Sequence, residues 1–130
     1  MRVARGRAVG ASELRSATFT GRVWADPILP PQDGVVVNDV LFEPGARTHW
    51  HSHEVAQILH VRAGEGWLQV QDGDGQPLTA ADTAHIPAGE VHWHGATATS
   101  FLLHLAVSVG ETAWLGEVTD EDYRAALGDA

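Results

Sequence analysis

GARTHWHSHEVAQ, residues 45–57, carries a histidine at every second position, at His49, His51 and His53, and ends on Gln57. Residues two apart in a β-strand lie on the same face. The three imidazoles are therefore expected to project to one side, with Gln57 following in the same parity after a short connection. Neutral imidazole is a common metal ligand, so this stretch predicts a strand that carries a metal site.

A second stretch repeats the alternation further along the chain. IPAGEVHWHGA, residues 86–96, places His92 and His94 on one face of an expected strand. His104 belongs to a similar pattern in a later strand. The sequence thus predicts that further imidazoles lie on single faces of later strands.

The rest of the chain predicts an all-β domain, because short apolar runs alternate with turn residues. The expected strands cover residues 17–24, 35–43, 55–64, 65–71, 79–89 and 100–109, with a loop at 26–34 and a hairpin turn at 71–77. Residues 118–127 predict the one helix, which Thr119 can cap. So many short strands in a small domain favour a sandwich or a barrel.

Length and composition narrow the class further. A chain of 130 residues has the size of one domain, and we expect an N-terminal arm, frayed or lightly docked, over residues 1–15 and a single domain over residues 16–130. The net charge of −9 disfavours nucleic acid and membrane surfaces as partners. Without cysteine or lysine, thiolate and Schiff-base chemistry are excluded. The first residues lack the apolar region of a signal peptide, so a cytoplasmic location is expected.

The two histidine stretches resemble the paired motifs of the small single-domain cupins. The matching positions are Gly45, His51, His53, Gln57 and Gly64 in the first motif and Pro87, Gly89 and His92 in the second. The acid of the first motif is replaced by Gln57. Ala81 and Ala96 stand where the second motif has glycine and asparagine, at positions that shape turns.

The resemblance implies an all-β cupin jelly-roll β-barrel with a short C-terminal helix and a divalent metal held by His51, His53, Gln57 and His92. Mn²⁺ or Fe²⁺ is favoured, and Zn²⁺, Ni²⁺ or Cu²⁺ also suit these ligands. Because Gln57 replaces an acid, all four ligands are neutral and the metal would keep its full Lewis acidity. Cupins commonly associate through their sheets, so a homodimer or homotetramer is expected.

Wider stretches, among them FEPGARTHWHSH and IPAGEVHWHGA, resemble the bacterial cupin hydroxynitrile lyases. This resemblance implies a small-molecule substrate, an aromatic cyanohydrin that is cleaved reversibly to an aldehyde and hydrogen cyanide. His94 is the first candidate for the base that takes the hydroxyl proton, and His104 is the second. His49 is expected to narrow the pocket.

Other functions remain open from the sequence. A metal-dependent dioxygenase of a small aromatic or diketone substrate would consume oxygen, although Gln57 removes the acid that flavonol-cleaving cupins use. A sugar-acid isomerase would need basic residues in the pocket, and the arginines cluster in the terminal arm. A non-catalytic cupin that binds a small molecule is the third alternative.

Aromatic and basic residues near the motifs are expected to be structural. Trp50 and Trp93 alternate with the ligand histidines and should point away from the metal. Arg47 is expected to be solvated at a strand end. The other three tryptophans are assigned to the core: Trp24, Trp67 and Trp114.

Overall fold

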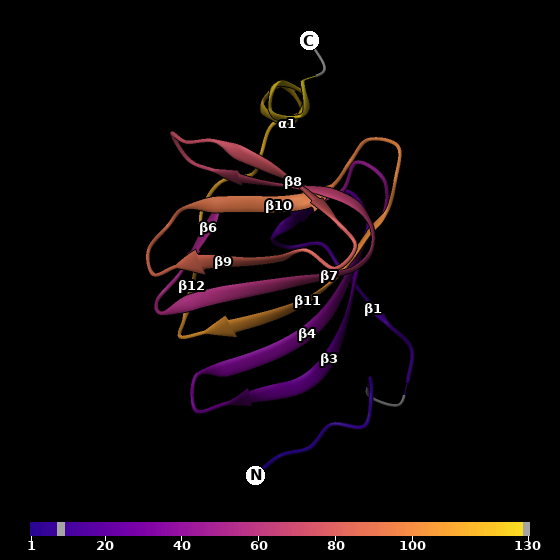
Figure 1. Ribbon diagram of the computed structural model, residues 1–130, viewed down its shortest axis with the longest axis vertical. Coiled ribbons are helices and arrows are strands. Elements are labelled where there is room, and N and C mark those ends of the chain that lie inside the picture. Colours follow the sequence, from indigo (N-terminus) through magenta and orange to yellow (C-terminus); the bar gives the residue numbers. More distant parts are fainter. Residues whose placement is uncertain (8–9, 129–130) are drawn as a thin grey trace.

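A computed structural model describes residues 1–7 and 10–128, and its strands form a nearly closed barrel with one short helix outside it (Figure 1). The all-β barrel with a short C-terminal helix predicted from the sequence is confirmed. The N-terminus and the helix lie at opposite ends of the molecule (Figure 1). Residues 8–9 of the expected arm and residues 129–130 of the expected domain lie outside the described residues.

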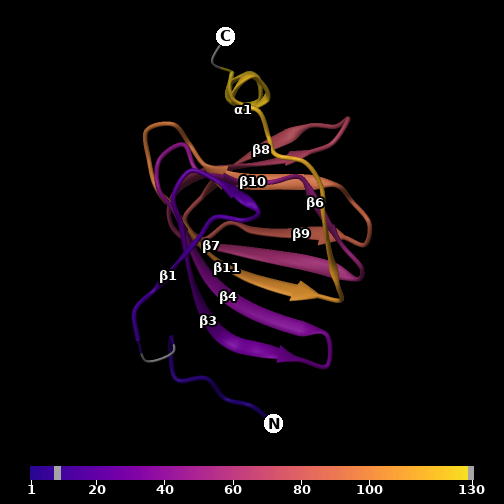
Figure 2. The ribbon, with the colours of Figure 1, turned by 180° about the vertical axis from the view of Figure 1, so that it is seen from behind.

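Two antiparallel sheets face each other. The first contains, in order, β1 (Glu13–Arg15), β3 (Val23–Gln32), β4 (Val35–Phe42), β11 (Leu102–Val109), β7 (Ala56–Val70) and β9 (Thr83–Pro87). The second contains β8 (Gly75–Thr79), β7, β10 (His92–Ala96), β5 (Arg47–Thr48) and β2 (Phe19–Thr20), while β6 (His51–His53) pairs with β10 and β12 (Thr112–Trp114). In the view from behind, the chain after β1 reaches the second sheet near β10 (Figure 2).

Strand β7 joins the two sheets. The sequence predicted two strands here, whereas the structure has a single strand of 15 residues. Residues 56–64 pair with β11, and residues 66–70 pair with β10. Gly64, with φ +85°, lies at the passage between the sheets, where a Cβ would collide with the carbonyl of Phe101. The crossing brings residues from both sheets to one interior.

The prediction of a loop at residues 26–34 is wrong, because β3 continues to Gln32. This segment contains three prolines, which lack a backbone N–H and are rare inside a sheet. They are tolerated because β1 pairs with β3 only at residues 23–25, so the rest of β3 is an edge. Bulges on both sides of Leu29 accommodate the irregular register.

The core fills the space between the sheets. Its members are apolar residues that alternate along the strands, including Val23, Phe42, Leu59, Val61, Leu68, Ile86 and Leu102. A smaller outer cluster docks helix α1 (Asp120–Leu127), with Tyr123 packed on Trp93. Thr119 caps this helix by accepting a hydrogen bond from the Asp122 amide, as predicted. No helix in the described part of the chain is both long and apolar enough to cross a membrane.

Candidate metal centre and adjoining cavity

Three of the predicted ligands meet inside the barrel. His51 and His53 point inward from β6, and His92 lies opposite His51 on the neighbouring strand β10. One nitrogen from each imidazole lies within 4.8 Å of the other two, and all three side chains are buried. Within residues 1–7 and 10–128 this is the only such group of potential metal ligands. The three histidines therefore form a candidate divalent metal site.

The Nδ1 nitrogen of each of these imidazoles contacts an oxygen atom of the protein. His51 Nδ1 donates to the His49 carbonyl at 2.9 Å, and His92 Nδ1 donates to the Glu90 carbonyl at 2.8 Å. His53 Nδ1 lies 3.1 Å from Thr112 Oγ1. Such contacts fix the ring orientation and leave the Nε2 lone pair for a metal. His53 Nε2 is indeed buried, and no described residue forms a hydrogen bond with it.

The Gln57 amide supplies a test of whether a metal fits. Its Nε2 donates to Ser108 Oγ at 3.1 Å, and its Oε1 lies 3.0 Å from His92 Nε2. Because neutral His92 has its proton on Nδ1, both of these atoms present lone pairs and no proton lies between them. A cation between them would resolve the conflict. The residues present therefore suit a divalent metal, with Gln57 as the predicted fourth ligand.

Burial keeps the three imidazoles in the neutral form that metals bind. Desolvation lowers the pKa of His51 to about 3, with the neighbouring His92 adding to the effect. Desolvation also lowers the pKa of His92 to about 4 and shifts the pKa of His53 downward. Metal binding would therefore face little competition from protons near neutral pH.

His94 and His104 form a second pair of histidines beside this group. His94 lies on β10 two residues from His92, and His104 faces it from β11 with its Nε2 3.0 Å from His94 Nδ1. Burial lowers the pKa of His94 well below 6.5, and it lowers that of His104 to about 4. His94 Nε2 and His104 Nδ1 are buried and have no hydrogen-bond partner in the part of the chain that the structure describes. The pair is therefore neutral and has a lone pair available.

A partly open cavity of about 190 Å³ connects the three-histidine site with the His94–His104 pair. Five of the six predicted site residues line it, and His92 lies behind Gln57. The remaining lining residues were not predicted as site residues: Phe19, Val36, Asn38, Val40, Phe42, Thr48, Ala106, Ser108, Gly110, Thr112 and Trp114. Several of them continue the alternation of a predicted strand, such as Ser108 after His104 and Ala106, and this signal could have identified them.

Three structural expectations need correction. Arg47 is 4% exposed instead of solvated, because it donates to the Val118 carbonyl at 2.7 Å and pairs with Asp120 at 2.8 Å. Trp114 is 43% exposed and lines the cavity instead of filling the core. The other two tryptophans assigned to the core, Trp24 and Trp67, are only partly buried.

His49 does not line the cavity that it was expected to narrow. Its carbonyl instead accepts the hydrogen bond that orients His51. Trp93 points away from the histidines into the cluster beneath α1, and Trp50 packs against the same cluster, as predicted.

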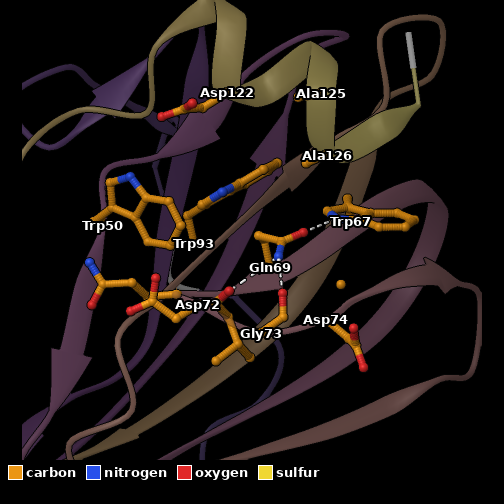
Figure 3. Close-up of a pocket in the computed structure, with 13 residues that line it drawn as sticks. Trp50, Trp67, Gln69, Asp72, Gly73, Asp74, Trp93, Asp122, Ala125 and Ala126 are labelled. Atoms are coloured by element: carbon orange, nitrogen blue, oxygen red, sulfur yellow. Dashed lines mark hydrogen bonds between the residues drawn. The ribbon is translucent and has the colours of Figure 1, made fainter. Parts of the chain in front are cut away.

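A larger cleft of about 680 Å³ lies outside the barrel, between the turn after β7 and helix α1 (Figure 3). Three tryptophans line it, Trp50, Trp67 and Trp93, around Gln69 (Figure 3). Gln69 accepts a hydrogen bond from the Trp67 indole and donates to the Gly73 carbonyl, so its polar groups are satisfied within the cleft. Among the described residues no histidine lines this cleft, and the buried side-chain polar atoms without a hydrogen-bond partner belong to residues of the inner cavity.

Comparison with known proteins gives two matches to the sequence. The sequence model of the cupin domain matches residues 38–108. A protein of Granulicella tundricola named (R)-mandelonitrile lyase is 43% identical over 112 residues, which cover 82% of this chain and 86% of that protein.

Solved structures agree on the fold. A cupin-like protein of Thermotoga maritima superposes with a TM-score of 0.83 at 38% identity, covering 97% of this chain and 96% of that one. The polyketide cyclase RemF of Streptomyces resistomycificus has a TM-score of 0.73 at 19% identity over 98% of this chain and 94% of its own. The second likeness concerns the fold alone.

Proposed function

The chain belongs to the cupin domain family, and from this premise we propose that it is a metal-dependent lyase that reversibly cleaves an aromatic cyanohydrin to an aldehyde and hydrogen cyanide. One observation carries the proposal. A neutral ligand group and a neutral histidine pair, His94 and His104, open onto the same small cavity. The similarity to a mandelonitrile lyase supports the choice of substrate.

The ligand group would hold the metal through His51, His53, His92 and Gln57. A divalent metal bound there would act as a Lewis acid toward the substrate hydroxyl, and Mn²⁺ or Fe²⁺ is the proposed ion. The protein's own part is to keep these side chains neutral and buried. The cavity holds about 190 Å³, or the space of about six water molecules, which suits a small substrate.

We assign His94 as the base that accepts the hydroxyl proton. One proton occupies the 3.0 Å contact between His94 Nδ1 and His104 Nε2. We place it on His94 Nδ1, because this is the tautomer in which His94 Nε2, which has no hydrogen-bond partner among the described residues, carries a lone pair. His94 Nε2 then presents its lone pair in the cavity, and His104 fixes the tautomer of His94.

The proposed reaction balances within this cavity. The hydroxyl proton moves to His94 Nε2, and the carbon–oxygen bond becomes a carbonyl as the bond to the nitrile carbon breaks. The electron pair of that bond leaves with the nitrile carbon as cyanide. Cyanide then takes the proton from protonated His94 and departs as hydrogen cyanide, which restores the neutral imidazole.

The proposal is tested by measuring cyanide release from racemic mandelonitrile before and after metal removal and Mn²⁺ reconstitution. We expect release that disappears with the metal and returns on reconstitution. Stoichiometric metal without cyanide release would refute the lyase assignment, and oxygen uptake with a small aromatic or diketone substrate would then indicate a dioxygenase.

The role of His94 is tested by His94→Ala. This variant should retain metal, because His94 is not a proposed ligand, while kcat falls about 10²-fold or more. His60→Ala is the matched control, since His60 is exposed on the outer face of β7. A His94→Ala variant with full metal content and an unchanged kcat would remove His94 as the base.

A further inference from the structure

One wall of the cavity is a continuous row of aromatic rings. Phe42 lies deepest, with its ring centroid 5.7 Å from His94 and 5.2 Å from His104. Phe19 follows at 6.2 Å from Phe42, and Trp114 follows at 6.1 Å from Phe19. The row therefore leads from the proposed base to the outside of the barrel.

Trp114 is the outer end of this row. It lies opposite His51 in the pairing of β12 with β6, and the two ring centroids are 4.6 Å apart. Its side chain contacts the ligand group on one side and solvent on the other, because the residue is 43% exposed. A tryptophan in this position buries further apolar surface only when a ligand covers it.

A second hollow meets the cavity at this point. It has a volume of about 440 Å³, is lined by residues 14–19 among others, and shares Phe19, Asn38, Val40 and Trp114 with the cavity. The cavity is also lined by aliphatic side chains, those of Val36, Val40 and Ala106. When the reacting carbon of a substrate lies beside His94, the rest of the substrate can extend toward solvent along the aromatic row.

We propose that Trp114 determines specificity by binding the aromatic ring of the substrate. This inference rests on the proposed function, because that function places the reacting carbon beside His94. Aromatic pairs in offset or edge-to-face contact are more stable than their buried area alone predicts. Contact with Trp114 therefore stabilises the complex with an aromatic substrate more than the complex with a substrate that carries a saturated ring of the same size.

A binding experiment with an unreactive pair of ligands tests the inference. Benzyl alcohol and cyclohexylmethanol carry the same hydroxyl and differ in whether the ring is aromatic. We expect the Mn²⁺-loaded protein to bind benzyl alcohol more tightly in calorimetry, and Trp114→Leu to reduce this preference about threefold to tenfold. Trp114→Phe should retain part of the preference. Trp67→Phe, in the outer cleft, should retain all of it.

Equal metal content in the variants is required, since Trp114 contacts His51. If Trp114→Leu fails to fold, the wild-type protein still gives a test. Loaded with diamagnetic Zn²⁺, the protein should give one indole N–H signal in NMR spectra for each of its five tryptophans, and benzyl alcohol should shift the Trp114 signal more than any other. An unchanged ligand preference in Trp114→Leu, or a Trp114 signal that does not respond, overturns the inference. Neither result depends on cyanide release, so failure of the lyase assignment would be recognised separately.

Discussion

Ser108 is the residue that decides which end of the Gln57 amide faces the histidines. Its Oγ accepts a hydrogen bond from Gln57 Nε2, which turns Oε1 toward His92. Without this hydroxyl the amide is free to rotate and donate its NH₂ group to the His92 lone pair, in competition with a metal. Ser108→Ala should therefore weaken Mn²⁺ binding about tenfold or more.

The measurement is the Kd for Mn²⁺ from competition with a chelator. Ser108→Thr keeps the hydroxyl and should bind Mn²⁺ nearly as the wild type does, whereas Gln57→Ala should lose most of the affinity. Ser100→Ala is a control for loss of a hydroxyl, because Ser100 lies in the loop before β11 and outside the cavity. A wild-type Kd in Ser108→Ala would show that Gln57 does not need this partner.

Among the secondary-structure elements, helix α1 is attached to the barrel through Arg47 of β5. The guanidinium donates to the Val118 carbonyl and to Asp120 and lies 4.5 Å above the Tyr123 ring. Arg47→Met would leave the Val118 carbonyl buried without its partner, so we expect the free energy of unfolding to fall by about 1–3 kcal/mol. Urea denaturation followed by fluorescence measures this change.

Asp120→Asn is the matched control for the same contact. The Asp120 carboxylate is exposed, and solvent screens its attraction to Arg47. Its substitution should therefore have a much smaller effect than Arg47→Met. Equal losses in the two variants would show that the ion pair, and not the carbonyl contact, attaches the helix.

The elements also show how far the sequence could predict this molecule. Alternation along single strands was enough to place His51 and His53 on one face of their strand and His92 and His94 on one face of theirs, because side-chain parity is a local property. Pairing between distant strands is not local. The site role of Trp114 depends on β12 pairing with β6, and the burial of Arg47 depends on Val118 and Asp120, far along the chain. Neither contact leaves a pattern in the residues around it.

At the scale of the whole molecule, the barrel collects imidazoles from β6, β10 and β11 into one buried interior. In the metal-free protein these imidazoles stay neutral, and no cation binds to their lone pairs. The same burial that suits them to bind a metal therefore makes the fold sensitive to acid. The homodimer or homotetramer and the cytoplasmic location stay predictions from the sequence.

This sensitivity can be measured through His104, whose pKa burial lowers from 6.5 to about 4. Below pH 6.5 the unfolded chain binds a proton at this position that the folded chain does not, so stability falls until the pH reaches about 4. The loss is about 1.4 kcal/mol per pH unit for each such histidine. Urea denaturation of the metal-free protein at pH 7, 6 and 5 should show a steep decline that is shallower in His104→Gln by about that amount. Parallel declines in the two proteins would mean that His104 is protonated in the folded state, and the assignment of a neutral His94–His104 pair would fall with it.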